Sequence, residues 1–137
     1  MKLLLVDDHE MVRLGLKSYL SMQDGIDQVL EASDGQEGVE VALQERPDVI
    51  IMDIVMPHMT GIEATLAILK EWSDAKILIL TSYLDNEKIY PVLDAGAKGY
   101  MLKTSSAEEI LRAIRKVEHG ELAIETEVSQ KVEYRKN

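Results

Sequence analysis

Short apolar runs alternate with stretches of helical periodicity along nearly the whole chain, and this alternation constrains the fold most. Five apolar runs are candidate strands: Lys2–Val6, Gln28–Ala32, Asp48–Met52, Lys76–Leu80 and Lys98–Leu102. Candidate helices lie between and after them, near residues 10–22, 35–46, 61–71, 87–95 and 106–119. The runs are apolar throughout, which is typical of strands covered on both faces. Five successive strand–helix units predict an α/β fold in which helices cover both faces of a parallel sheet.

Composition narrows the class of protein further. The 137 residues suggest one domain, and with 4% aromatic residues and no Phe its core should be aliphatic. The lack of cysteine excludes disulfides, thiolate metal sites and cysteine nucleophiles, and it fits a reducing cytoplasm. We find neither a signal peptide nor an apolar run near the roughly 18 residues that span a bilayer. We therefore expect a soluble, cytoplasmic protein without a membrane partner.

The chain is strongly acidic, with 25 acidic and 15 basic residues and a formal net charge of -10. This charge argues against nucleic acid as a direct partner of this segment, because phosphate backbones bind positive patches. A divalent cation suits it better. Simple solubility would explain the charge equally well.

Polar side chains that could bind a ligand or take part in catalysis lie where four of the predicted strands end. They are Asp7 and Asp8 after the first strand, Asp53 after the third, Thr81 after the fourth and Lys103 after the fifth. Each alone has a plain explanation, such as a helix cap, a turn or a solvated charge. Ligands of open α/β sheets bind beyond the carboxyl ends of the strands. Together these residues therefore predict one site at that rim.

Electrostatics indicates what such a site would hold. Two like charges about 4 Å apart repel by about 4 kcal/mol near a protein surface, so clustered carboxylates raise a pKa or recruit a cation. Oxygen ligands on an open rim favour a hard ion such as Mg²⁺. With Lys103 and Thr81 beside it, the ion would complete a receptor for a phosphoryl group. Asp53 is the natural nucleophile, since carboxylates form aspartyl phosphates.

The segments LLLVDDHEMVRLGL, PDVIIMDIVMPHMTGIEA, ILILTSY and AGAKGYMLKTSS together resemble the receiver domain of bacterial two-component response regulators. The resemblance covers about residues 2–120 and implies a flavodoxin-like sheet of five strands in the order 2-1-3-4-5. DDHEMVR and DAGAKGYMLKTSSAEEI further resemble the NarL/FixJ-type branch, whose receivers carry a C-terminal helix-turn-helix domain, and more loosely the envelope-stress regulators of the VraR/LiaR type. We therefore expect a receiver domain at 1–120 and, at 121–137, a linker towards an absent DNA-binding domain.

The resemblance implies roles for the acidic residues. Asp53 matches the residue that accepts phosphate from the phosphohistidine of a sensor kinase. Asp8 matches the principal Mg²⁺ carboxylate. Asp7 matches a residue that assists it through a water molecule. Val55 matches the position whose backbone carbonyl also binds the metal.

The resemblance also implies roles at the ends of the last two strands. Thr81 and Lys103 match the pair that binds the phosphoryl group. Tyr100 matches the aromatic residue that turns inward on activation, following the Thr81 hydroxyl. The family often has a cis proline after the lysine, whereas Thr104 follows here. Because a non-proline cis bond costs about 2.5–4 kcal/mol, the geometry of Lys103–Thr104 stays open.

The surface that would transmit the signal is predicted from two helices. On the first helix, one side should face the sheet, and this side carries Val12, Leu16, Tyr19 and Leu20. Met11 and Leu14 point the other way and mark a candidate partner surface, while Arg112 and Arg115 lie on the outer side of the fifth helix. We expect homodimerisation through these two helices on phosphorylation. A surface around the fourth helix and Tyr90 is the alternative.

Other functions fit the sequence less well. A nucleotide binder of this architecture needs a Gly- or hydroxyl-rich loop where Asp7 and Asp8 stand. A magnesium-dependent phosphohydrolase with an aspartate nucleophile usually has a second acid at the position of Val55. A stand-alone receiver without DNA output also remains open. We expect a switch and not a turnover enzyme. Either His9 or His58 could line the site, although solvated side chains are the expectation for both.

Overall fold

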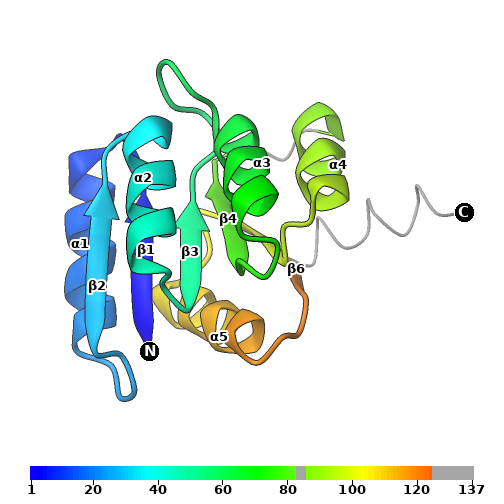
Figure 1. Ribbon diagram of the computed structural model, residues 1–137. Coiled ribbons are helices and arrows are strands. Elements are labelled where there is room, and N and C mark those ends of the chain that lie inside the picture. Colours follow the sequence, from blue (N-terminus) through cyan, green and yellow to red (C-terminus); the bar gives the residue numbers. More distant parts are fainter. Residues whose placement is uncertain (83–85, 125–137) are drawn as a thin grey trace, which may run out of the picture.

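One parallel sheet organises the computed structural model, which describes residues 1–82 and 86–124, with only the backbone of 86–89. The strands of this described part are β1 (Lys2–Val6), β2 (Gln28–Ala32), β3 (Val49–Met52), β4 (Ile77–Thr81), β5 (Gly99–Leu102) and β6 (Ala123–Ile124). They lie in the order β2-β1-β3-β4-β5-β6, and all neighbouring pairs are parallel (Figure 1). The five predicted strands are confirmed within one residue at each end.

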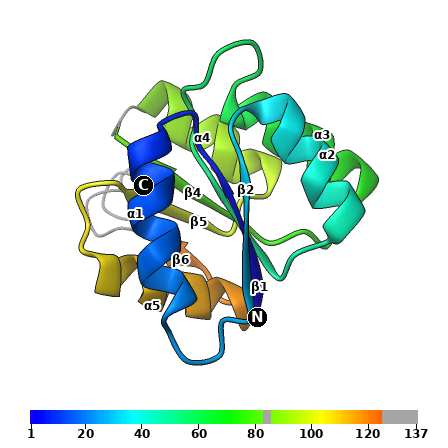
Figure 2. The same ribbon diagram turned by 90° about the vertical axis from the view of Figure 1, so that its left-hand side faces the viewer.

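Five helices follow the first five strands in this part of the chain: α1 (Glu10–Ser21), α2 (Gly35–Glu45), α3 (Gly61–Glu71), α4 (Asn86–Ala95) and α5 (Ala107–Glu118). Figure 2 shows α1 and α5 on one side of the sheet and α2, α3 and α4 on the other. Each side has its own core. Leu3, Leu5 and Ile51 point towards α1 and α5, whereas Leu4 and Ile50 point the other way, as the alternation along a strand requires.

The sixth strand corrects the prediction of a five-stranded sheet. β6 pairs with β5 at Gly99 and Tyr100, within the segment that was predicted as a linker. A two-residue strand is too short to show a period in the sequence. Gly99 is required for this pairing, since a Cβ on it would lie 2.7 Å from the Ala123 carbonyl oxygen. The rest of the predicted linker, residues 125–137, lies outside the described residues.

The first helix turns the predicted side towards the sheet. Leu20 is buried, and Leu16 and Tyr19 pack against the core as expected. Val12 also borders Leu5 and Ile51 of the sheet, but it is 39% exposed because it lies in the first turn of α1, at the mouth of a hollow. No helix in the described ranges combines the length and hydropathy needed to cross a membrane.

Close packing at the start of α3 positions the loop that follows β3. The Gly61 amide donates a hydrogen bond to the Ile54 carbonyl oxygen at 2.7 Å. A Cβ on Gly61 would lie 2.0 Å from the Asp53 carbonyl oxygen, so only glycine fits. The helix then begins with a capping box, in which Thr60 and Glu63 bond each other's backbone amides.

We expect Gly61→Ala to lower the free energy of unfolding by about 1–3 kcal/mol, since the backbone of the β3–α3 loop must shift to admit the methyl group. Gly15→Ala is the matched control. Gly15 lies inside α1 with nothing within 4 Å of its would-be Cβ, so alanine should stabilise the protein by about 0.5–1 kcal/mol. Urea unfolding measures both, and equal effects of the two substitutions would contradict the packing argument.

Candidate functional site

The predicted site residues meet at the carboxyl end of the sheet. Asp7, Asp53 and Lys103 each stand one residue beyond a strand, and Thr81 is the last residue of β4. The backbone hydrogen bonds of the sheet continue through these positions. The Asp53 amide donates to the Val6 carbonyl oxygen at 3.0 Å, and the Lys103 amide donates to the Thr81 carbonyl oxygen at 2.8 Å. The parallel register therefore brings together residues that are up to 96 positions apart in sequence, from Asp7 to Lys103.

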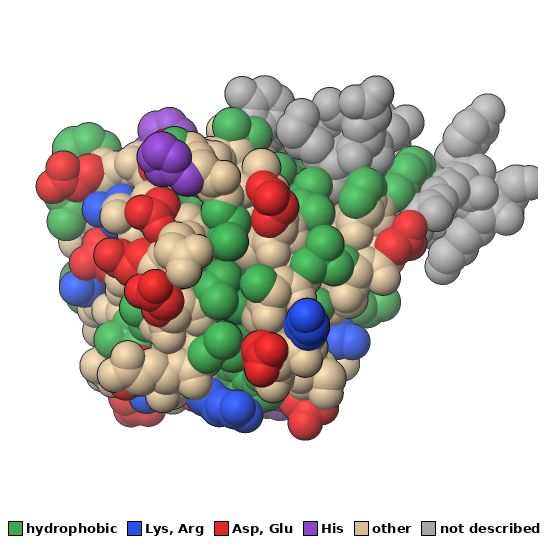
Figure 3. All heavy atoms as spheres, turned by 45° about the horizontal axis from the view of Figure 1, so that its top comes forward, with side chains coloured by type: hydrophobic (Ala, Val, Ile, Leu, Met, Phe, Trp, Pro, Cys, Tyr) green, Lys and Arg blue, Asp and Glu red, His purple; other side chains and the backbone are tan. Residues whose placement is uncertain are grey.

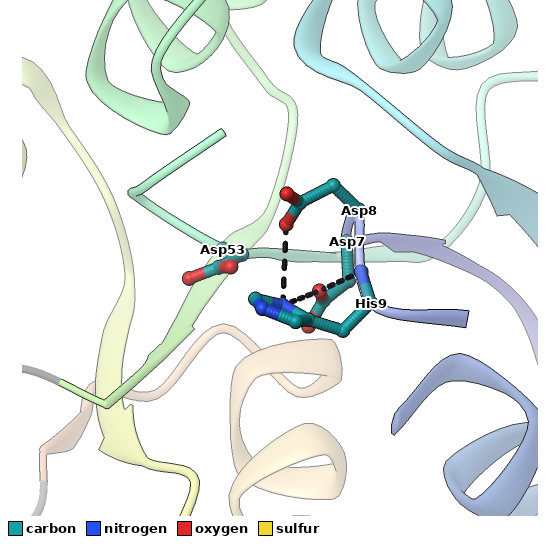
Figure 4. A group of neighbouring side chains, drawn as sticks. All are labelled: Asp7, Asp8, His9 and Asp53. Carbon is teal, nitrogen blue, oxygen red and sulfur yellow. Dashed lines mark hydrogen bonds and ion pairs between the residues drawn. The ribbon is translucent and has the colours of Figure 1, made fainter. Parts of the chain in front are cut away.

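Three carboxylates and one imidazole form the centre of the site. One ligand atom from each of Asp7, Asp8, His9 and Asp53 lies within 4.8 Å of all the others (Figure 4). Asp7 and Asp53 are only 6% and 4% exposed, whereas Asp8 and His9 are exposed. Figure 3, which views this end of the molecule, shows acidic and histidine side chains close together on the surface. The site is therefore a shallow acidic pocket with a buried floor.

Lys103 supplies the positive charge nearest to the buried carboxylates. Its Nζ lies 2.7 Å from Asp7 Oδ2 and 3.1 Å from Asp53 Oδ2. Burial lowers the pKa of Lys103, but the hydrogen bonds and charges of the two carboxylates outweigh burial and raise it overall. One ammonium therefore neutralises only part of the charge of two carboxylates.

Asp53 is the carboxylate whose ionisation is most disfavoured. Burial raises its pKa most, and the negative charge of Asp7 raises it further. The charge and hydrogen bond of Lys103, together with the Ile54 amide that donates to Asp53 Oδ1 at 2.8 Å, act in the opposite direction without cancelling the rise. A cation bound at the site would offset the free-energy cost of ionising Asp53.

His9 lines the site, which the sequence left open, and its side chain is also exposed as expected. Its Nδ1 lies 3.0 Å from Asp7 Oδ1 and 3.2 Å from Asp8 Oδ1. Its backbone amide also donates to Asp7 Oδ1, at 2.8 Å. The only sequence signal was its place directly after the two aspartates, which also suits an ordinary residue before a helix.

Arg13 is a second residue that sequence reasoning missed. From the first turns of α1, its guanidinium donates to the Asp7 carbonyl oxygen, and its Nε lies 3.4 Å from Glu31 Oε1. Lys17, one turn further along, lies 3.1 Å from the other Glu31 oxygen. These contacts fix α1 to the end of β1 and to β2.

The remaining predicted residues lie around this centre. Thr81 and Tyr100 are fully buried, and Tyr100 packs in the core on the side of α2, α3 and α4. The Val55 side chain is exposed two residues beyond Asp53, and His58 is exposed with a left-handed backbone, φ 70°. The described residues contain no cis peptide bond, so Lys103–Thr104 is trans.

The donor atoms suit a hard divalent cation. Three carboxylates with one ammonium leave a net charge of about −2 at the pocket, and exposed Asp8 keeps it open to water. Mg²⁺ is bound in proteins by one or two carboxylates together with several waters, which matches this partly open set. The pocket thus combines a potential cation site with a buried carboxylate and an ammonium.

Comparison with known proteins gave a consistent family match. The family model for the response regulator receiver domain matches residues 3–115. The transcriptional regulatory protein LiaR of Bacillus subtilis (strain 168) is 54% identical over 131 residues, which are 96% of this chain and 62% of LiaR. The response regulator protein VraR of Staphylococcus aureus (strain Mu3 / ATCC 700698) is 46% identical over 98% of this chain and 64% of VraR. The chain thus spans less than two thirds of these relatives.

Solved structures agree with the sequence relatives. The crystal structure of a LuxR-family two-component response regulator from Aurantimonas sp. SI85-9A1 has a TM-score of 0.92 and 32% identity, covering 98% of this chain and 96% of that one. The response regulator ChrA of a heme-sensing two-component system has a TM-score of 0.78 and 35% identity, covering 98% of this chain and 64% of that one.

We expect Asp53→Asn to stabilise the protein at neutral pH when divalent cations are removed by a chelator. Because the folded state raises the pKa of Asp53, the ionised carboxylate costs stability, and this cost appears as the pH rises through that pKa. The gain from the substitution should therefore grow as the pH rises above the ordinary carboxyl pKa of about 4, and it should reach on the order of 1 kcal/mol, the usual size for one substitution. Urea unfolding of both proteins at several pH values measures it. A gain that shrinks with rising pH would refute the electrostatic account.

Proposed function

The chain belongs to the response regulator receiver family, as a receiver domain of a two-component system, and we propose that Asp53 is its phosphorylated residue. One observation carries this proposal: the nearly buried Asp53 carboxylate lies between a cluster of potential cation ligands and the Lys103 ammonium, 3.1 Å away. The phosphoryl donor would be a phosphohistidine of a sensor histidine kinase. Because such kinases use ATP, we place the reaction in the cytoplasm.

The proposed reaction is a direct phosphoryl transfer. An Asp53 carboxylate oxygen attacks phosphorus, the P–N bond to the donor imidazole breaks, and the imidazole leaves with the bonding electrons and takes up a proton. Lys103 then exchanges its contact with Asp53 Oδ2 for the phosphoryl oxygens, while it keeps Asp7 at 2.7 Å. The Thr81 hydroxyl, at the end of the neighbouring strand, would donate a hydrogen bond to the same group.

Receiver domains bind Mg²⁺ at an acidic pocket, and the acidic pocket of this chain fits that ion. We assign Asp8, Asp7 and Asp53 as its carboxylate ligands and the Val55 carbonyl as a backbone ligand. When bound, Mg²⁺ supplies positive charge that neutralises the phosphoryl oxygens. The domain would catalyse only its own phosphorylation and the slow hydrolysis of its acyl phosphate. The apolar Val55 supports a switch over a phosphohydrolase, which usually has an acid at this position.

We propose that Thr81 and Tyr100 transmit the change. Thr81 would move towards the phosphoryl group, and Tyr100 on the adjacent strand would occupy the space behind it. Tyr100 is already fully buried here, so its inward position is compatible with the packed core. Phosphorylation would then favour a conformation that is accessible without it.

The proposed output is a homodimer formed through α1 and the start of α5. Met11 is 81% exposed and Leu14 47% exposed on the outer side of α1, while the opposite side of this helix lines a hollow of about 200 Å³ together with Leu80 and Ile110. An exposed methionine and leucine on one helix can pack against the same pair of a second copy across a two-fold axis.

The two arginines predicted at this surface are less well placed. Arg115 donates to the Asp24 carbonyl oxygen of its own chain at 2.9 Å. Arg112 lines a different hollow, between α5 and β6. We therefore assign the dimer contact mainly to Met11 and Leu14.

The relatives extend beyond the length that this chain covers, and one of them is named a transcriptional regulatory protein. We propose that the complete protein carries a DNA-binding domain after residue 137, connected to the receiver by the part of the predicted 121–137 linker that follows β6. DNA would be bound only through that domain, which agrees with the net charge of -10 here.

Incubation with acetyl phosphate and Mg²⁺ followed by intact mass measurement tests the phosphorylation. We expect the mass of one phosphoryl group to be added to the wild type, and nothing to be added to Asp53→Asn or in the presence of a chelator. Asp74→Asn is the matched control, because Asp74 is exposed in the segment before β4, at the opposite end of the sheet. Labelling of Asp53→Asn to the level of this control would overturn the assignment.

Sedimentation with a beryllofluoride phosphate mimic tests the dimer. The wild type should shift from monomer to dimer, and Met11→Asp should stay monomeric because it places a charge in an apolar contact. Met22→Asp is the control, since Met22 is 82% exposed at the other end of α1. The α1 surface would be excluded if both variants dimerised like the wild type.

A further inference from the structure

We propose that His9 binds the divalent cation directly and makes the site prefer first-row transition ions, such as Mn²⁺ and Co²⁺, over Mg²⁺. The inference rests on the proposed function only in that it uses the same cation site. The pattern of carboxylates predicts a hard ion held by oxygen alone. The structure adds a nitrogen donor to that set.

The position of the imidazole fits a metal shell. In octahedral coordination with metal–ligand distances of about 2.1 Å, neighbouring ligand atoms lie about 3.0 Å apart and opposite ones about 4.2 Å apart. His9 Nδ1 lies 3.0 Å from Asp7 Oδ1 and 3.2 Å from Asp8 Oδ1, which are two such neighbouring distances. With Asp53 included, the four atoms span at most 4.8 Å, so a small closure would bring them around one ion (Figure 4).

In the structure the His9 ring contacts Asp7 and Asp8, and in the proposal a bound cation replaces these contacts. His9 is the residue before α1, with an extended backbone, yet its side chain makes no capping hydrogen bond to the helix. Its backbone amide is bound to Asp7 Oδ1 at 2.8 Å, which fixes the ring relative to that carboxylate. The side chain is 60% exposed, so Nε2 can keep its proton in contact with water while Nδ1 binds metal.

Ligand chemistry then predicts selectivity. Imidazole suits transition ions, whereas Mg²⁺ prefers oxygen ligands and retains its waters. Carboxylates alone suit Mg²⁺ and Mn²⁺, so an imidazole added to the three carboxylates should strengthen binding more for Co²⁺ and Ni²⁺ than for Mg²⁺. The contribution of the imidazole should increase from Mn²⁺ to Co²⁺ to Ni²⁺, the general order of affinity for nitrogen and oxygen sites.

A positioning role for His9 makes a different prediction. If the ring only orients Asp7 and Asp8 through hydrogen bonds, its removal should weaken all ions by a similar factor. The ratio of affinities for two ions therefore separates a ligand from a residue that supports ligands.

Calorimetric titration of Mg²⁺, Mn²⁺, Co²⁺ and Ni²⁺ into wild type and His9→Ala tests the proposal. We expect the Co²⁺-to-Mg²⁺ affinity ratio to fall about 10-fold or more in the variant, with the loss growing from Mn²⁺ to Ni²⁺. His119→Ala is the matched control, because His119 is 69% exposed at the far end of α5, and it should leave the ratio unchanged. His9→Gln, a polar replacement that lacks the imidazole, should behave as His9→Ala.

The absorption spectrum of bound Co²⁺ gives a second readout. Its ligand-field bands should change between wild type and His9→Ala and stay the same in His119→Ala. Equal losses for all four ions, or an unchanged ratio together with an unchanged Co²⁺ spectrum, would overturn the proposal. The outcome is independent of phosphorylation, because failure of acetyl phosphate to label the wild type would refute Asp53 as acceptor without altering these ratios.

Discussion

Two nearly buried carboxylates, Asp7 and Asp53, share the ammonium of Lys103, and the rest of the pocket depends on this imbalance. Burial makes the negative charge of Asp53 costly, and one ammonium does not offset it. A further positive charge bound at the site would therefore stabilise it. A site that binds a cation and then a phosphoryl group requires this property. A site fully neutralised by its own side chains would have no comparable need for either.

The fold holds these charges together by close backbone packing. Parallel strands deliver their carboxyl ends to one edge, and the start of α3 packs against the end of β3. Gly61 is the extreme case, since the start of α3 lies against the Asp53 carbonyl with no room for a side chain. Repulsion among the acids is thus opposed by the aliphatic cores on both faces of the sheet, which bury every residue of β3 and β4.

Most of the architecture could be predicted from the sequence because the apolar runs of buried parallel strands differ clearly from the helical stretches between them. β6 could not be predicted, because two residues are too few to show a period and because its pairing with β5 depends on Gly99 having no side chain. The grouping of Asp7, Asp53 and Lys103 followed from topology, because their strands end at one edge. The contacts of His9 could not be predicted from topology, because an imidazole before a helix can point either to solvent or towards the carboxylates.

Hydrogen bonds from the Asp53 and Lys103 amides to the adjacent strands extend the sheet beyond its formal ends. Such bonds open only when the centre of the sheet itself unfolds, whereas loops and helix termini open at much lower free energy. The backbone beneath the carboxylates should consequently be among the last parts of the molecule to exchange its amide hydrogens. Slow conformational exchange, on the microsecond-to-millisecond timescale, would then be confined to side chains and to peripheral segments, while the backbone beneath the carboxylates keeps its conformation.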